Sequence, residues 1–268
     1  MLIDTHSHPQ TRQFNKDRSA VLARAHAAGV STLIVVGFDP ESSRAALELA
    51  RSSPDYWATS GIHPHDAASV READWQALER SAADPKVVAL GEMGLDFFRN
   101  LSPRDVQRAA FQRQLDLCAA HDLPAVVHSR DAEAATWEIL EPWMRERRRA
   151  GGTEPFGVMH CYAYGAVAAL RYIELGFVIS IPGTVTYPKN DRGQEVARSV
   201  PDDTFVLETD CPYLTPQSHR GARNEPSYIV ETLNAVAALR GQPRDAVARM
   251  TTACARRLFR LPDNAPAT

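Results

Sequence analysis

The sequence has few cysteines and no long apolar run. Its four cysteines stand far apart at positions 118, 161, 211 and 254 and form no C-x-x-C pair, so nothing indicates a disulfide framework. No window approaches the roughly 18 uncharged apolar residues of a membrane helix. The first predicted strand starts too early to leave room for a signal peptide. We therefore expect reduced thiols, a cytoplasmic location and no membrane partner.

An excess of charge of one sign is also missing. The 30 Lys and Arg residues stand against 33 Asp and Glu, which leaves a formal charge of -3. Because the whole molecule does not attract a polyanion, nucleic-acid binding would need a local basic patch. The 268 residues contain no repeat or low-complexity tract, and 44% are hydrophobic. This composition is typical of a globular protein and predicts one domain over residues 1–268.

Short apolar runs rich in β-branched residues alternate with amphipathic segments. They predict eight strands, at 2–6, 31–37, 56–62, 87–93, 125–129, 156–160, 177–181 and 205–210. Apolar residues at three- and four-residue spacing predict helices at 19–29, 41–53, 103–121, 132–149, 227–241 and 243–261. Such alternation is typical of parallel sheets. A G-x-G-x-x-G turn is missing after the first strand, so we predict the α/β class and a TIM-like (β/α)8 barrel rather than an open sheet.

Ionisable side chains gather at the C-terminal ends of these predicted strands, where enzymes of the barrel fold carry their chemistry. They are His6, His8, His63, His65, Glu92, His128, His160 and Asp210. Of the nine histidines only His26, His121 and His219 lie elsewhere. We therefore predict that the eight groups share one rim.

Six of these groups are candidate metal ligands. Four imidazoles and two carboxylates exceed the needs of one tetrahedral ion and suit two divalent metals; they belong to His6, His8, His128, His160, Glu92 and Asp210. Imidazole favours Zn, Mn, Fe or Co over Mg, whereas phosphate oxygens favour Mg or Mn, so the identity of the metal stays open. Glu92 lies between the two histidine groups and is the candidate bridge. A structural ion pair between Glu92 and an arginine is the alternative.

Strand alternation places further groups beside these ligands. Asp4 falls on the face of His6 and His8, with Ile3 on the other face, and Glu208 falls below Asp210. We expect Asp4 and Glu208 to hold ligand imidazoles through hydrogen bonds. Cys161 and Cys211 each follow a candidate ligand, and alternation predicts that both point away from the site and pack as small apolar groups. Asp96 lies beyond the predicted strand end and is not assigned to the site.

Seven motifs follow one another from Leu2 to about Leu258: DTHSH, GIHPH, GEMGLDFFR, VVHSRDA, HCY, LETDCPYLTP and HRGARNEP. Together they resemble the TatD family of metal-dependent deoxyribonucleases in the amidohydrolase superfamily. The resemblance implies a TIM-like barrel, a binuclear metal site and hydrolysis of phosphodiesters in DNA. It implies one ion on His6, His8, Glu92 and Asp210 and another on Glu92, His128 and His160. The segments HCYAYG and SIPGTVTYPKND depart from the family pattern, and both are expected to overlook the site.

The predicted function is that of a metal-dependent hydrolase, a deoxyribonuclease of the 3'-5' exonuclease type. Metal-activated water would attack the phosphodiester, with Glu92 and Asp210 as catalytic residues. Asp210 would orient the water or take its proton; pure metal ligation is the alternative. An amide or ester hydrolase, such as a D-aminoacyl-tRNA deacylase with a tRNA-linked substrate, is the second hypothesis. A non-enzymatic nucleic-acid-binding or assembly protein is the third.

Residues near the predicted strand ends are candidates for binding the substrate. The predicted contacts are His63, Arg99, Arg130, Tyr162 and Arg220, and Lys189 and Arg223 add positive charge. His63 is expected to contact phosphate, with a loop-stabilising role as the alternative. Phe97, Tyr162, Tyr164 and Tyr213 offer ring faces for unpaired bases, although packing under a loop would also explain them. These side chains favour single-stranded DNA or DNA ends as the partner.

Overall fold

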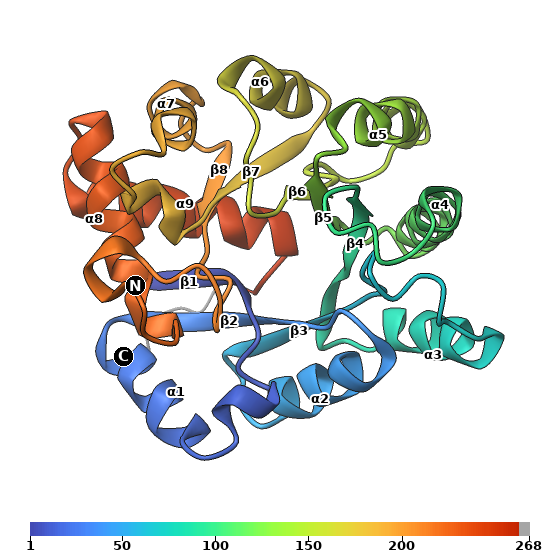
Figure 1. Ribbon diagram of the computed structural model, residues 1–268, viewed down its shortest axis with the longest axis horizontal. Helices are drawn as coiled ribbons and strands as arrows, with labels where there is room; N and C mark the ends of the chain where they lie inside the picture. Colours follow the sequence, from blue (N-terminus) through green and yellow to red (C-terminus); the bar gives the residue numbers. More distant parts are fainter. Residues whose placement is uncertain (263–268) are drawn as a thin grey trace.

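A computed structural model describes residues 1–262 of the chain. Within them lie eight strands: β1 (Leu2–Ser7), β2 (Val30–Val36), β3 (Tyr56–Ser60), β4 (Val87–Asp96), β5 (Ala125–Arg130), β6 (Gly157–Met159), β7 (Phe177–Ile181) and β8 (Phe205–Leu207). The strands pair in parallel in the order of the sequence. A bridge between Ser7 and Cys211 brings the two edges together, and Figure 1 shows the resulting nearly closed barrel. The predicted (β/α)8 barrel is confirmed.

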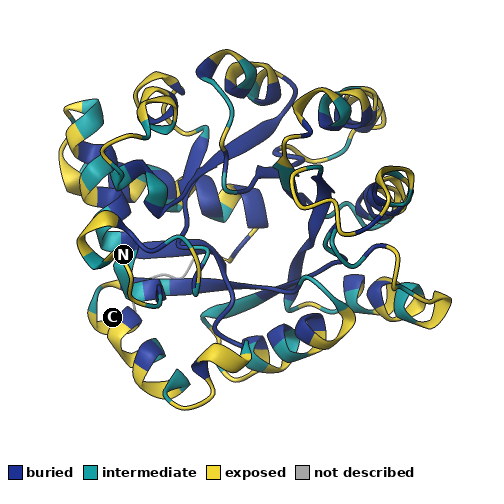
Figure 2. Ribbon diagram, viewed as in Figure 1, coloured by how far each residue is buried: buried dark blue, intermediate teal, exposed yellow. Residues whose placement is uncertain are grey.

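Helices surround the barrel (Figure 1). Residues 1–262 contain α1 (Arg18–Ala27), α2 (Pro40–Arg51), α3 (Glu72–Ala82), α4 (Arg104–His121), α5 (Glu133–Arg149), α6 (Ala166–Glu174), α7 (Asp191–Ser199), α8 (Ile229–Arg240) and α9 (Arg244–Phe259). Short 3-10 turns lie at Arg12–Phe14, Gly183–Thr186, Gln217–His219 and Pro226–Tyr228. Figure 2 shows buried strands enclosed by helices that expose only their outer faces.

Local sequence explains where several helices begin and end. The Asp39 carboxylate accepts a hydrogen bond from the Ser42 backbone N–H at 2.6 Å, and Pro40 opens the first turn of α2. Both features satisfy or remove backbone donors that a helix start leaves unpaired. Helix α8 ends at a glycine. Gly241, directly after its last residue, adopts a φ of +61°, a conformation that glycine takes without a steric penalty.

Two apolar layers hold the barrel together. The outer layer lies between the strands and the surrounding helices. The inner layer fills the barrel with residues from most strands, including Ile34, Val126, Val158 and Val206. The last turns of α9 join this cluster, and Phe259 is 1% exposed. Because Thr252 of α9 donates a hydrogen bond to the Met1 carbonyl oxygen, α9 lies at the N-terminal end of β1. The helix thus closes one end of the barrel, and the C-terminal ends of the strands remain open for a site.

The strands alternate between these two layers. In β2, Leu33 and Val35 pack outward with the helices, whereas Ile34 and Val36 pack inward. In β4, Leu90, Met93 and Leu95 belong to the outer layer. Regular alternation breaks between Leu90 and Met93, where the pairing of β4 with β5 shifts register. Beyond this point Glu92 and Asp96 lie on the face opposite Met93 and Leu95.

Candidate metal centre

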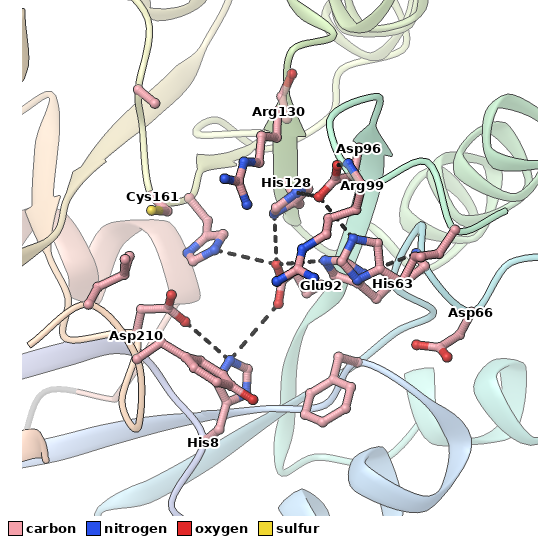
Figure 3. A pocket seen from close by; sticks show the side chains of 18 residues that line it. His8, His63, Asp66, Glu92, Asp96, Arg99, His128, Arg130, Cys161 and Asp210 are labelled. Carbon is pink, nitrogen blue, oxygen red and sulfur yellow. Dashed lines mark hydrogen bonds and ion pairs between the residues drawn. The ribbon is translucent and has the colours of Figure 1, made fainter. Parts of the chain in front are cut away.

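A cavity of about 690 Å³ lies at the C-terminal ends of the strands. Seven of the eight groups predicted for the rim line it, namely His8, His63, His65, Glu92, His128, His160 and Asp210. The eighth, His6, is 1% exposed, and its Nε2 atom lies 3.5 Å from Glu92 Oε2. Figure 3 shows His8, His63 and His128 around Glu92, with Asp210 beside His8. The structure therefore brings all eight groups together.

The carboxylate of Glu92 faces two groups of imidazoles. Its Oε2 atom lies 3.5 Å from His6 Nε2 and 4.0 Å from His8 Nε2. Its Oε1 atom lies 3.1 Å from His128 Nδ1 and 3.4 Å from His160 Nε2. Each carboxylate oxygen therefore belongs to a different cluster of nitrogen atoms.

Asp210 completes the cluster on the Oε2 side. Its Oδ1 atom lies 3.4 Å from His8 Nε2 and 3.8 Å from His6 Nε2. The backbone N–H of Asp210 donates to the His6 carbonyl oxygen at 2.9 Å. The contact that closes the barrel between β1 and β8 thus also places Asp210 beside the two histidines.

Two glycines set the course of β4 around Glu92. Gly91 has a φ of +132° and Gly94 a φ of +135°, values that other residues rarely adopt. A Cβ atom on Gly91 would lie 2.4 Å from the Val126 carbonyl oxygen, and one on Gly94 would lie 2.0 Å from the His128 carbonyl oxygen. The close approach of β4 to β5 at both positions therefore requires glycine on each side of Glu92.

Hydrogen bonds fix which nitrogen of each ring faces the centre with a lone pair. His8 Nδ1 donates to the Val36 carbonyl oxygen at 2.8 Å, which leaves Nε2 as the acceptor. His160 Nδ1 lies 3.1 Å from Glu208 Oε2, and this contact likewise leaves Nε2 toward Glu92. In His128 the roles of the two nitrogens are reversed, because Nε2 lies 3.2 Å from Asp96 Oδ2 and Nδ1 faces Glu92.

His63 differs from these three rings. Its Nδ1 atom accepts the backbone N–H of His65 at 3.1 Å, so the proton of the neutral ring is on Nε2. This N–H points at Glu92 Oε1, 3.4 Å away. The His63 ring therefore presents a donor to the cavity, which suits an oxygen atom better than a cation.

The donor set fits divalent cations. The Nε2 atoms of His6 and His8 lie only 3.2 Å apart, and at least the His8 atom presents a lone pair. Within the described residues, the buried His6 Nδ1 atom has no hydrogen-bond partner. Lone pairs and carboxylate oxygens crowded this closely repel one another unless a cation lies between them.

Burial and neighbouring charges set the ionisation states of Glu92 and His6. Burial alone would raise the pKa of Glu92, but the imidazoles of His160 and His63 hold that pKa well below its usual range. Burial together with the charge of His160 lowers the pKa of His6 to about 3. Glu92 is therefore an anion and His6 a neutral ring, which are the forms that bind metal ions.

Glu208 lies behind His160. Besides its contact with His160 Nδ1, the carboxylate accepts hydrogen bonds from Ser180 Oγ at 2.6 Å and from the Cys161 backbone N–H at 2.8 Å. Asp4 makes no such ring contact within the described residues. It accepts hydrogen bonds from the Thr209 backbone at 3.0 Å and hydroxyl at 2.6 Å and from the His6 backbone. The structure thus places Asp4 against the segment that carries Asp210 and not against an imidazole.

Asp96 is a site residue that the sequence analysis did not assign. Its Oδ2 atom lies 2.9 Å from His65 Nε2 and 3.2 Å from His128 Nε2, and its side chain is 1% exposed. Strand β4 continues to Asp96, beyond its predicted end at position 93. The alternation in GEMGLD, which puts Glu92 and Asp96 on one face, was the signal that would have found it.

The predicted substrate contacts divide into two sets. His63, Arg99 and Arg130 line the cavity, and Arg130 lies over the Phe98 ring at 4.0 Å. Tyr162 and Arg220 do not line it. Tyr162 is 7% exposed because its ring packs in the outer apolar layer, and its hydroxyl donates to Gly165. Arg220 is exposed and lies over the ring of Tyr187 at 4.3 Å, and its role and that of Tyr162 in substrate binding stay predictions.

The remaining aromatic and basic candidates are mostly engaged elsewhere. Tyr213 lines the cavity and is 50% exposed. The Phe97 ring lies under Arg104 at 4.4 Å, and the Tyr164 hydroxyl bonds to Ser129 at 2.8 Å. Arg223 forms two hydrogen bonds to the Asp17 carboxylate, at 3.0 and 2.6 Å. Only Tyr213 among the four aromatic residues therefore offers a free ring face at this cavity.

Cys161 also lies in the cavity wall, and the prediction that it points away was wrong. Strand β6 ends at Met159, and Cys161 has a φ of +45°, so strand alternation no longer applies there. Cys211 is fully buried, as predicted. All four cysteines are free thiols. Within residues 1–262 no helix is both long and apolar enough to cross a membrane.

Comparisons with known proteins match nearly the whole chain. The family model described as TatD related DNase matches residues 3–260. The chain is 37% identical to the metal-dependent hydrolase YabD of Bacillus subtilis, covering 97% of this chain and 100% of that protein. It is also 37% identical to the 3'-5' ssDNA/RNA exonuclease TatD of Salmonella typhimurium, covering 92% and 94% of the two chains.

A solved structure shows the same architecture. The crystal structure of YJJV, a TatD homologue from Escherichia coli, superimposes with a TM-score of 0.90 at 30% identity and covers 97% of this chain and 98% of that chain. Two groups of side chains that could hold a metal ion include Glu92, one with His6 and His8 and the other with His63 and His128, and one relative is named a metal-dependent hydrolase. The chain belongs to the family of TatD-related DNases.

Proposed function

We propose that this protein is a two-metal nuclease that removes nucleotides from the 3' end of single-stranded DNA. The observation that carries the proposal is the position of Glu92, whose two oxygens face two separate nitrogen clusters in one open cavity. One ion would be held by His6, His8, Glu92 and Asp210, and the other by Glu92, His128 and His160. When bound, divalent ions lower the pKa of water and stabilise charge that develops on a phosphoryl oxygen.

The residues of the chain have distinct tasks in this proposal. Asp210 lies at the cavity with 13% of its side chain exposed, where it orients the attacking water and accepts its proton. Glu208 holds the His160 ring through Nδ1, and Asp96 holds the His128 ring through Nε2. Both carboxylates fix the orientation of a ligand ring and raise its basicity.

Phosphate binding is assigned to three donors in the cavity wall. His63 directs its Nε2–H inward, and Arg99 and Arg130 contribute guanidinium groups. The guanidinium of Arg130 lies over the Phe98 ring at 4.0 Å. Phosphate contacts by arginine provide much of the affinity of proteins for nucleic acid, independently of sequence. A local positive wall of this kind offsets the net charge of -3 of the whole chain.

Support for a 3'-5' polarity and for single strands comes from the relatives. The curated protein of Salmonella typhimurium that matches this chain is named a 3'-5' ssDNA/RNA exonuclease. The deacylase alternative uses the same centre, because a metal-activated water also attacks esters. Cytoplasmic location stays a prediction from the isolated, reduced cysteines.

The test compares four substrates with one preparation. The protein is incubated with single-stranded DNA, duplex DNA, RNA and D-aminoacyl-tRNA, each in Mg²⁺, in Mn²⁺, in Zn²⁺ and in a chelator. We expect single mononucleotides from the 3' end of single-stranded DNA, with release at least about 10-fold faster than from duplex DNA. A Glu92→Gln preparation controls for contaminating nucleases. Deacylation of D-aminoacyl-tRNA without release of nucleotides would overturn the proposal in favour of the alternative.

A further inference from the structure

Cys161 forms a group of possible ligands with two neighbours at the centre. Its Sγ atom, a ring nitrogen of His160 and a carboxylate oxygen of Asp210 all lie within 4.8 Å of one another. Figure 3 shows Cys161 on the same side of the cavity as Asp210. This group overlaps the two-ion arrangement but is not part of it, since neither nitrogen cluster around Glu92 includes the thiol.

The backbone brings the thiol into this position. Two consecutive residues on a strand point to opposite sides, yet His160 and Cys161 both line the cavity. The chain leaves β6 at Met159 and adopts a φ of +45° at Cys161. A non-glycine residue in this conformation is uncommon and persists only where its surroundings hold it. Here the Cys161 backbone N–H is held by Glu208 Oε1 at 2.8 Å.

The ring of His160 has only one nitrogen available for a cation. Its Nδ1 atom is engaged by Glu208, so Nε2 serves both the cluster around Glu92 Oε1 and the group with Cys161. One lone pair binds one ion at a time. Asp210 is different, because its Oδ1 atom is the one nearest His6 and His8 and a carboxylate has a second oxygen.

We propose that Cys161, His160 and Asp210 form a third cation position, which takes thiophilic ions such as Zn²⁺ or Cd²⁺ and competes with the working centre for His160. Binding would form a metal–sulfur bond as the S–H proton leaves to solvent, with no change of oxidation state. Thiolate ligands select soft ions, so Mg²⁺ and Mn²⁺ would not fill the position. Excess thiophilic metal would therefore inhibit hydrolysis that Mg²⁺ or Mn²⁺ supports.

A spectroscopic titration tests the thiol ligand without reference to activity. A cadmium–thiolate bond gives a charge-transfer absorption in the ultraviolet, which imidazole and carboxylate ligands do not give. Cd²⁺ is titrated into wild type, Cys161→Ser and Cys211→Ser, the last being a matched control at a fully buried thiol that also follows a ligand. We expect the band in wild type and in Cys211→Ser and its loss in Cys161→Ser. A band that persists in Cys161→Ser, or no band in wild type, would overturn the proposal.

Inhibition tests the competition for His160, and this part rests on the proposed function. Hydrolysis in saturating Mn²⁺ is measured against increasing Cd²⁺, and each variant is normalised to its own rate without Cd²⁺. We expect the half-inhibiting concentration to rise at least about 10-fold in Cys161→Ser, since the soft ligand is gone. Equal inhibition in both proteins would overturn the competition. If no hydrolysis is found at all, the proposed function fails, while the absorption band still decides the third position.

Discussion

Asp96 Oδ2 lies 3.2 Å from His128 Nε2, on the far side of the ring from Glu92. Burial alone would raise the pKa of Asp96, but the imidazole of His128, the Arg99 backbone and His65 hold it below its usual range. A charged acceptor at Nε2 leaves His128 Nδ1 free with its lone pair toward the centre. Asp96 therefore orients the ring, and Glu92 lies on its metal-binding side.

Replacement of Asp96 by Asn removes the charge and keeps the shape. An amide that turns its NH2 group toward Nε2 would favour the wrong nitrogen for metal binding. We expect metal affinity at the His128 cluster to fall about 10- to 100-fold, measured by metal analysis after dialysis at defined free Mn²⁺. Asp66→Asn, at another cavity-lining aspartate, is the control. Wild-type affinity in Asp96→Asn would show that the contact has no role in binding.

Glu92→Gln tests the bridge. The change keeps the shape of the side chain, but it removes the charge and places an NH2 donor toward one of the two nitrogen clusters. We expect lower occupancy of at least one ion and a fall in turnover of about 100-fold or more. Metal content and rate are measured on one preparation, with the exposed Glu79→Gln as control. If Glu92→Gln keeps two ions at full occupancy and near-normal hydrolysis, then Glu92 is not the bridge. The mechanism would then use one ion or a different bridging carboxylate, and Asp210 is the first to test.

Strand ends made most of the centre predictable. His6, Glu92 and His128 lie in separate strands, and His160 and Asp210 follow the ends of two others. A parallel barrel brings the carboxyl ends of its strands to one rim. Their meeting follows from strand order and needs no knowledge of side-chain conformation. The identity of the fold and the location of the cavity were therefore accessible from the sequence.

Deviations from regular strand geometry were not predictable. Ile3 packs inside the barrel with Ile34, although alternation from His6 would turn it outward, because the pairing of β1 with β2 shifts register between Asp4 and Ser7. Cys161 reaches the cavity wall because its backbone adopts a φ of +45° shortly after the strand. Bulges and left-handed residues arise from tertiary packing, and they leave no periodic trace in the sequence.

Glu225 provides a test of stability against pH, away from the metal centre. Arg24 donates to both of its oxygens, at 2.8 and 2.6 Å, and joins α1 to the segment after β8. Burial alone would raise the pKa of Glu225, but the Arg24 guanidinium and the Ser227 hydroxyl hold it below its usual range. The stabilisation is therefore fully present above the unfolded-state pKa of about 4.3 and is lost as the pH falls through the lower folded-state pKa.

We expect Glu225→Gln to lower the free energy of unfolding by about 1.5–3 kcal/mol at pH 7. The difference from wild type should shrink below a pH of about 4. Urea unfolding at pH 7, 5 and 3.5 measures it. Glu41→Gln is the control, because its ion pair with Arg12 is exposed on both sides, and such pairs contribute little. A difference between Glu225→Gln and wild type that does not vary with pH would show that the charge of Glu225 is not what stabilises the contact.

His63→Ala separates phosphate binding from metal binding. The ring presents an N–H group to the cavity because its Nδ1 atom accepts the His65 backbone, so its loss removes a donor and not a metal ligand. We expect turnover on phosphodiesters to fall about 100-fold, the scale for losing one electrostatic stabiliser, while both ions stay bound. His128→Ala, which removes a proposed ligand, serves as the comparison and should lose metal. The decisive measurement is the metal content of the two variants side by side under the same free Mn²⁺. If His63→Ala loses as much metal as His128→Ala, then His63 is itself a ligand. Its Nε2 atom would then bind the ion beside Glu92 Oε1, and Arg99 and Arg130 would hold the phosphate without it.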